Sequence, residues 1–333
     1  MKLFIVGDYY SNTGPANVTL RYIEEYKKQK KPYRHLVSKN KFLRAAELLW
    51  KLPGSSLVLF SGYSMQNIYG MRLARFFRKP CFYLMHGCVE HEDIINRVPD
   101  ERMKKGERKM LALADRILAV SEEFERWLKE NYPEYREKIT HLTNGVDWDV
   151  LERSAAGEAK KPLSVISVGG GMPRKRILNI CRALERLREE EKYRNLILTV
   201  AGDTGADSVA INSYSFVNNV GKVSHEELIR LYGAHKLFVQ NSVFESFGLA
   251  PLEALLCNTD VLISSVCGAL SVFGETEEGD LIRDPENIEE LAEKIRALLD
   301  GENHTRLLVE IDRRATSWEA RLKDLEELCK TVS

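Results

Sequence analysis

The feature that most constrains the fold is a regular alternation of short apolar runs with segments of helical periodicity. In the first half, LVLF (57–60) precedes MQNIYGMRLARFF, and RILAV (116–120) precedes SEEFERWLKENY. Short β-rich runs that alternate with helices in this way are typical of parallel sheets covered by helices on both faces. We therefore predict a doubly wound α/β fold.

The alternation lapses once and then restarts. Residues 152–162, ERSAAGEAKKP, are small, charged and proline-containing, as expected of a linker. Further apolar runs follow, among them LSVISVGG, LILTVAGD, KLFVQ and DVLISS. A chain of 333 residues suits two domains of roughly 150 residues each. We predict two similar Rossmann-like domains facing a cleft, with ligands bound at the carboxyl ends of the strands.

Composition narrows the class of protein. Net charge is zero, which argues against a dedicated nucleic-acid binder. Residues 1–150 carry 26 Lys and Arg against 19 Asp and Glu, or +7, and the remainder carries −7. The basic segments are YKKQKK, LARFFRK (73–79) and RMKKGERKM (102–110). They favour an anionic partner, such as a phospholipid surface or a phosphate-bearing acceptor, or equally an ordinary solvated surface.

The sequence lacks membrane-spanning and disulfide-type patterns, which sets expectations about location and redox state. The chain has no run of 18 apolar residues and no charged-then-apolar leader, so we expect a cytoplasmic protein, with peripheral contact at the inner face of a membrane as an option. Its six cysteines form no CxxC pair and are expected to be buried thiols.

The loop SVGGGMPRKR (167–176) follows a predicted strand and opens a predicted helix. Its glycines permit close backbone approach, and Arg174 and Lys175 add positive charge beside a helix N-terminus. These features favour an anion, most naturally a phosphate. The spacing is neither GxGxxG nor a P-loop, and a solvated surface turn is the alternative.

The loop FESFGLAPLE (244–253) has the opposite chemistry. Glu245 and Glu253 flank a turn in which Gly248, Leu249 and Ala250 should present backbone N–H groups before the helix opened by Pro251. Carboxylates accept hydroxyl protons and N–H groups donate to hydroxyl oxygens, as a sugar requires. For Glu253 alone, a first-turn acid that complements the helix dipole is the alternative. A phosphate loop beside a polyol loop predicts a nucleotide-sugar site.

At this point the sequence resembles the retaining glycosyltransferases of the GT-B fold, family 4, also called group 1. FESFGLAPLEA matches that family's E-x7-E signature, and HLTNGVD (141–147) matches its N-G-V-D segment. AVSE (119–122), LMHG and GKVSHEEL follow in the family's order. The resemblance implies a first, acceptor-binding domain of residues 1–151 plus 317–333, because the final helix crosses back to it. Residues 152–316 would be the nucleotide-sugar-binding domain.

The resemblance also implies roles for single residues. Catalytic roles would fall to Glu245, His86 and Lys175, with Lys175 neutralising the diphosphate and Glu253 binding the ribose. The acceptor would meet Asn12, Thr13 and His86. The donor would be held by these residues: Gly14, Gly170, Gly171, Arg174, Lys175, Val223, Phe247, Gly248, Leu249 and Glu253. One departure is Gly170, where the family usually has Arg. Arg174 is the candidate replacement.

The expected activity is a hexosyltransferase-type reaction (EC 2.4) with retention. A sugar would move from a nucleotide donor, most naturally a UDP-sugar, to a glycan hydroxyl, as in bacterial surface polysaccharide or glycoconjugate synthesis. Neither HGCVEHED nor DWD (147–149) has metal-site spacing and placement, so we expect no metal and no cofactor. The acceptor is open, with a lipid-linked glycan as one option. A non-catalytic scaffold subunit of a glycosylation complex is the alternative function.

Overall fold

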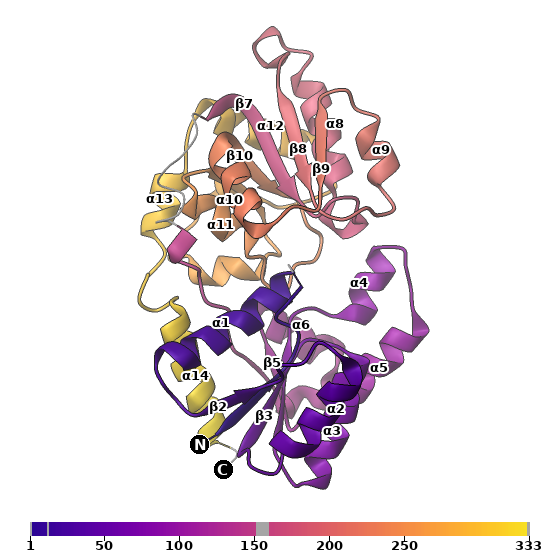
Figure 1. The fold of residues 1–333 in the computed structure, drawn as a ribbon. Helices are drawn as coiled ribbons and strands as arrows, with labels where there is room; N and C mark the ends of the chain where they lie inside the picture. The colour runs from indigo at the N-terminus through magenta and orange to yellow at the C-terminus, as the bar shows by residue number, and fades with distance from the viewer. Residues whose placement is uncertain (1, 12, 151–159, 332–333) are drawn as a thin grey trace. The chain divides into compact units, whose positions relative to one another are not determined.

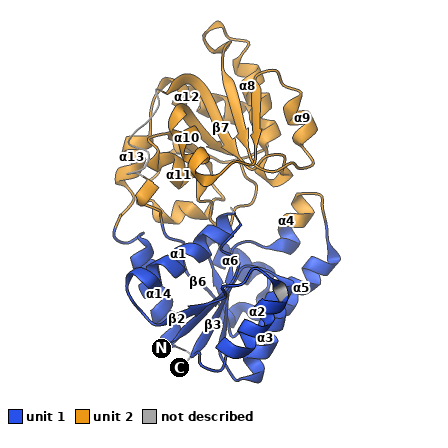
Figure 2. Cartoon of the chain, in the orientation of Figure 1, with its two compact units in different colours: residues 1–91, 99–145, 314–333 blue, residues 92–98, 146–313 orange. Residues whose placement is uncertain are grey.

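The computed structural model describes residues 2–11, 13–150 and 160–331, and it divides into two compact units (Figure 2). Unit 1 comprises Met1–His91, Pro99–Gly145 and Arg314–Ser333. Unit 2 comprises Glu92–Val98 and Val146–Arg313. The predicted linker falls mainly on residues outside the described ranges. The predicted cleft between the two domains stays a prediction.

Unit 1 is built on a six-stranded parallel sheet in the order β2-β1-β3-β4-β5-β6. Its central strands are almost wholly buried, as expected for a parallel sheet covered on both faces. The strands are β1 (Leu3–Val6), β2 (Tyr33–His35), β3 (Leu57–Ser61), β4 (Cys81–Met85), β5 (Arg116–Ala119) and β6 (Ile139–His141).

Helices α2, α3 and α5 cover one face of this sheet, and α1 packs with α14 on the other (Figure 1). Leu322, Leu325 and Cys329 of α14 are buried, so the last helix completes the core of unit 1. The helices of unit 1 are α1 (Gly14–Lys28), α2 (Lys41–Lys51), α3 (Met65–Phe76), α5 (Glu101–Leu113), α6 (Glu122–Asn131) and α14 (Trp318–Lys330). Helix α4 (Val89–Ile95) begins in unit 1 and continues into the segment Glu92–Val98 of unit 2.

Unit 2 repeats the plan with the sheet order β12-β11-β10-β7-β8-β9. Helices α8 and α12 pack together on one side of it, and α10, α11 and α13 form a second group. Its strands are β7 (Lys161–Val168), β8 (Ile197–Ala201), β9 (Val217–Gly221), β10 (His235–Gln240), β11 (Asp260–Ser264) and β12 (Leu281–Ile282). Its helices are α8 (Ile177–Leu187), α9 (Ser208–Asn212), α10 (His225–Ala234), α11 (Ala250–Leu256), α12 (Ile288–Asp300) and α13 (His304–Val309).

The predicted fold class is confirmed: both units are parallel, helix-covered α/β sheets. In unit 2, β10 and β7 are neighbours in the sheet. The loops that follow these two strands therefore leave the same edge side by side.

Candidate donor site

The glycine loop at the end of β7 packs backbone against backbone. Gly169 and Gly170 donate N–H bonds to the Ala201 carbonyl at 2.8 and 3.0 Å. Gly170 has a φ of +58°, and a Cβ there would lie 1.9 Å from the Asp203 carbonyl oxygen. No side chain fits at residue 170 without moving the loop after β8. An arginine at residue 170 is therefore incompatible with this geometry of the loop.

The acid-flanked loop after β10 is bonded directly to the glycine loop. Val243 donates its N–H to the Arg174 carbonyl at 3.0 Å, and the Arg174 guanidinium donates to the Phe244 carbonyl at 3.3 Å. The two turns that the sequence assigns to phosphate and to sugar are therefore adjacent in unit 2.

The turn into α11 requires glycine at residue 248. Gly248 has a φ of +86°, and a Cβ on it would lie 2.8 Å from Cys267 Sγ and 2.9 Å from Gln240 Nε2. Leu249 is the N-cap of α11, and its side chain caps no N–H group. The backbone of this turn is thus packed tightly against Cys267 and Gln240. The N–H groups at the start of α11 have no partner within the helix.

Glu245 is the centre of a charged cluster. Its Oε2 accepts hydrogen bonds from Lys175 Nζ, from Arg174 Nη1 at 3.5 Å and from Gln240 Nε2 at 3.3 Å. Burial alone would raise the pKa of Glu245, but the charges of Lys175 and Arg174 outweigh it and hold the pKa below its ordinary value. Glu245 is therefore an anion that holds two cations.

Arg174 has a second acidic neighbour, because its Nε lies 3.3 Å from Glu92 Oε2. The Asn96 amide oxygen accepts the Arg174 backbone N–H at 3.2 Å. Both residues come from the short segment Glu92–Val98, which belongs to unit 2 although it is remote in sequence. Arg174 is thus fixed in place from two sides.

Glu253 has different partners. In the first turn of α11, its Oε1 lies 3.0 Å from His225 Nε2, and Tyr232 donates to its Oε2 at 3.5 Å. His225 opens α10 two residues after Val223, which is half-buried in the loop from β9. The structure thereby joins Glu253 to the GKVSHEEL segment through His225.

His86 lies in unit 1 at the end of β4. Its Nε2 is 2.8 Å from Ser61 Oγ, which is 2.7 Å from Thr19 Oγ1, and Thr19 donates in turn to the Pro15 carbonyl at 2.9 Å. Burial lowers the pKa of His86 to about 4, so the imidazole is neutral at pH 7. A neutral ring can accept or donate one hydrogen bond but carries no charge to a ligand.

The depressed pKa of His86 predicts a pH effect on stability. Between the unfolded value of 6.5 and the folded value of about 4, the unfolded chain binds more protons at this residue. Stability should therefore fall as pH drops through that window. We expect the melting temperature of His86→Gln to fall less than that of the wild type between pH 7 and pH 4.5, measured by scanning calorimetry. Parallel pH profiles would contradict this assignment.

The opening loop has a local structural role. Thr13 is the N-cap of α1, and its Oγ1 accepts the Ala16 N–H at 3.4 Å. Gly14 begins the helix and is exposed. Asn12 lies outside the described residues. An acceptor role for this loop therefore stays a prediction.

Two contacts of the cluster were not expected from the sequence, those of Gln240 and Glu92. Gln240 is the last residue of β10, and a polar residue at a strand end facing the predicted loops was an available signal. For Glu92, local sequence offers no such signal, because its contact with Arg174 bridges 82 positions, from 92 to 174.

Between residues 2 and 331, leaving out residues 12 and 151–159, no group of three or more His, Cys, Asp or Glu side chains is placed to hold a metal ion. Over the same residues, no helix combines the length and apolar character needed to cross a bilayer.

Comparison with known families and sequences matches both halves of the chain to glycosyltransferases. Residues 151–316 match the family model described as glycosyl transferases group 1, and residues 8–150 match that described as glycosyltransferase family 4. A D-inositol 3-phosphate glycosyltransferase of Nocardia farcinica is 27% identical over 278 residues, which cover 77% of this chain and 61% of the relative. An O-antigen chain mannosyltransferase B of Escherichia coli is 28% identical over 143 residues, covering 41% and 36%. The match thus spans less than two thirds of either relative.

Solved structures share the whole fold. Sucrose-phosphate synthase from Thermosynechococcus elongatus matches with a TM-score of 0.74 at 18% identity, covering 100% of this chain and 99% of that one. Anabaena HepE in complex with UDP and glucose matches with a TM-score of 0.70 at 15% identity, covering 99% and 100%. At such identities the likeness establishes the fold.

Proposed function

The chain belongs to the group 1 glycosyltransferases of family 4, with the GT-B fold, and we propose that it moves a sugar from a UDP-sugar to a hydroxyl of a glycan acceptor. The observation that carries the proposal is the adjacency of the two loops in unit 2. One presents Lys175 and Arg174, the other presents Glu245 and the uncapped turn at Leu249. Phosphate and sugar of one donor molecule require these two chemistries next to each other.

Lys175 and Arg174 act on the leaving group in the proposed reaction. The bond from the sugar C1 to the phosphate oxygen breaks, the bond from C1 to the acceptor oxygen forms, and the acceptor proton passes to the departing diphosphate. Negative charge grows on the diphosphate, so fixed cations beside it lower the barrier. No metal is needed for this role in the proposal.

Retention of configuration is proposed from the family, with attack on the face that the diphosphate leaves. Glu245 would orient the sugar hydroxyls, Glu253 the ribose, and neutral His86 would contact the transferred sugar. UDP is favoured as the leaving nucleotide because HepE, a structural relative, is crystallised with UDP and glucose. By analogy with the O-antigen mannosyltransferase, we propose a growing, lipid-linked bacterial surface glycan as acceptor.

The decisive experiment is calorimetric titration with UDP, GDP, ADP and uridine. We expect UDP to bind most tightly of the three diphosphates. Lys175→Ala should weaken UDP binding by roughly 10- to 100-fold, because one charge-assisted hydrogen bond to the phosphates is lost. Binding of uridine, which has no phosphate, should change little.

Lys192→Ala is the matched control, since this exposed lysine of unit 2 pairs with Asp300 at 2.6 Å. It should bind UDP as the wild type does. Unchanged UDP affinity in Lys175→Ala would remove that lysine from the donor site. Equal loss of UDP and uridine affinity would indicate a structural role for Lys175.

A further inference from the structure

Helix α2 turns its apolar side outward. Phe42, Leu43, Leu49 and Trp50 are 79%, 59%, 54% and 80% exposed, whereas Leu48 is 6% exposed. At 3.6 residues per turn these four exposed side chains occupy about a third of the helix circumference. An amphipathic helix of a folded protein normally buries such a stripe. In α2 the stripe is exposed to solvent, so it is available to a binding partner.

The neighbouring helix α3, which packs against α2, carries two exposed aromatic side chains of its own. Tyr69 and Phe76, seven residues apart and thus on one side of α3, are 64% and 78% exposed. The two helices meet on their inner sides, where a Cβ on Gly70 of α3 would lie 3.6 Å from Leu48 Cδ1. We call Phe42, Leu43, Leu49, Trp50, Tyr69 and Phe76 the α2–α3 surface. Six large apolar side chains on adjacent helices exceed the scattered exposure that needs no explanation.

The charge around this surface is strongly one-sided. Residues 39–80 contain eight Lys or Arg and one acid, Glu47, so their net charge is +7 in a chain of net charge zero. Glu47 accepts hydrogen bonds from the N–H groups of Val37 and Ser38 and from Lys51, each at 2.8 Å. Arg72 and Arg75 of α3 are exposed on a helix without an acid. The partner is therefore expected to be anionic.

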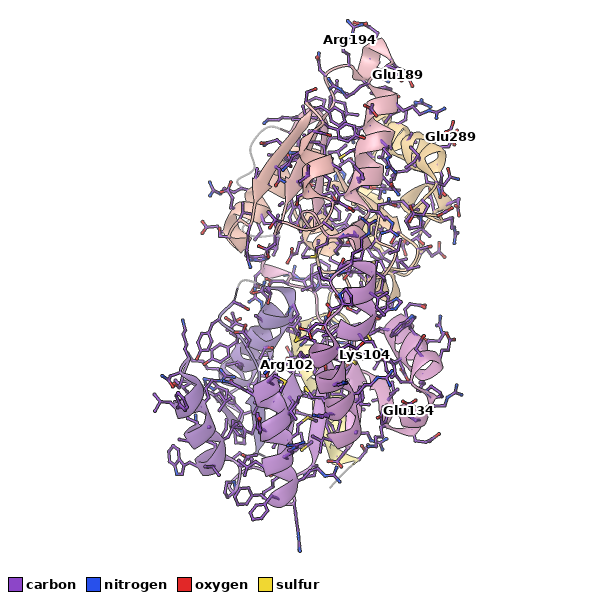
Figure 3. The ribbon with its side chains drawn as sticks, turned by 90° about the vertical axis from the view of Figure 1, so that its right-hand side faces the viewer. Arg102, Lys104, Glu134, Glu189, Arg194 and Glu289 are labelled. Atoms are coloured by element: carbon purple, nitrogen blue, oxygen red, sulfur yellow. The ribbon has the colours of Figure 1, made fainter. Side chains whose placement is uncertain are left out.

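Acids offset the positive charge of the other basic segments. On α5, where Figure 3 labels Arg102 and Lys104, Lys104 Nζ and Arg108 Nε each lie 2.9 Å from carboxylate oxygens of Glu90. Near the end of α1, Lys31 Nζ lies 2.7 Å from Glu326 Oε2. Of the three basic segments in the sequence, only LARFFRK (73–79) lies beside the α2–α3 surface, because it forms the last residues of α3 and the turn that follows.

We propose that the α2–α3 surface docks on an anionic lipid bilayer, with its aromatic and leucine side chains entering the headgroup region. Helices that lie on membranes combine this apolar stripe with flanking Lys and Arg. A second copy of the chain is disfavoured, because a symmetric contact would bring two such basic surfaces together. The inference does not depend on the transfer reaction, since no residue of the donor site contributes to it.

The test is co-sedimentation of the full chain with vesicles of phosphatidylcholine alone or mixed with phosphatidylglycerol. We expect binding to the mixed vesicles, weakened by salt, and little binding to phosphatidylcholine alone. The fluorescence of Trp50 should shift to the blue on binding, and Trp50→Phe should remove the shift. Phe42→Ser with Trp50→Ser should reduce binding at least about tenfold. Arg72→Gln with Arg75→Gln should reduce it roughly tenfold at low salt.

Unit 2 offers matched controls. Val209 and Val309 are 86% and 79% exposed, so their double change to Ser removes comparably exposed apolar groups. Arg186→Gln with Arg194→Gln removes two charges from the region of unit 2 where Figure 3 labels Arg194, Glu189 and Glu289. Both control variants, and Lys175→Ala, should bind vesicles as the wild type does.

Three outcomes would overturn the proposal. One is failure of the wild type to bind the mixed vesicles. Another is equal vesicle binding by the wild type and the Phe42/Trp50 variant. The third is a dimer in analytical ultracentrifugation that the same variant dissociates while vesicle binding persists. Loss of UDP binding in Lys175→Ala with normal vesicle binding would separate the two proposals.

Discussion

Replacing Glu245 by alanine is expected to lower kcat/KM for hydrolysis of the UDP-sugar by roughly 100- to 1,000-fold. The carboxylate has two tasks, because it holds Lys175 and Arg174 in place and would orient the sugar. Without it, two largely buried cations remain beside each other. Loss of one partner from a buried ion pair costs about 3 kcal/mol, which for a unit of this size lowers the melting temperature by roughly 10 °C. Kinetics and calorimetry measure the two effects separately.

Two further variants make this result interpretable. Glu245→Gln keeps the size of the side chain and one acceptor oxygen, so it should lose activity with a smaller loss of melting temperature. Glu286→Ala is the control, since among the described residues Glu286 accepts hydrogen bonds from Arg176, the residue after Lys175, and from Asn179 of α8, but not from Lys175 or Arg174. It should retain near wild-type kcat/KM. Wild-type kinetics for folded Glu245→Ala would exclude Glu245 from the reaction.

Gly170→Ala is expected to destabilise unit 2 by about 3 kcal/mol. The cost arises because residue 170 has a left-handed φ of +58° and because the new Cβ would lie 1.9 Å from the Asp203 carbonyl oxygen. The melting temperature should fall by roughly 10 °C. Gly170→Arg should be at least as unstable and should not improve UDP binding, although the change restores the residue usual in the family. Thermal unfolding and calorimetric titration measure both results.

Gly279 provides the matched control for that change. It lies in the same unit, and a Cβ on it would meet no atom within 4 Å. Gly279→Ala should therefore leave the melting temperature within about 1 °C of the wild type. A stable, tightly binding Gly170→Arg would show that the loop adapts, and that Arg174 is not the substitute cation.

The fold was predictable from sequence wherever burial is strong. The central strands are apolar runs of four or more residues, and the alternation pattern predicts such strands at LVLF, RILAV, KLFVQ and DVLISS. The strands not recognised are Tyr33–His35, Ile139–His141 and Leu281–Ile282, all at sheet edges and only two or three residues long. An edge strand of that length has too few buried positions to produce an apolar pattern.

The candidate site was predictable in outline for a topological reason. Gly170 and Glu245 follow strands that are neighbours in the sheet, so locating the strand ends was enough to place the loops together. The contacts that each side chain makes within the site were not predictable in the same way. The packing of Gly170 on Asp203 and the contact of Glu92 with Arg174 depend on segments that local pattern does not connect. The outward stripe of α2 was missed because periodicity reports a helix's apolar side but not its direction.

The membership of α14 in unit 1 has a consequence for synthesis of the chain. Apart from Glu92–Val98, unit 2 is one continuous stretch that ends at Arg313, whereas unit 1 also needs Arg314–Ser333. Trp318 packs against Gly145 and Tyr22, so α14 fills part of the core that earlier residues leave open. On the ribosome, the domain translated first is therefore the one that is completed last, because α1 lacks its packing partner α14 until the final residues have been made.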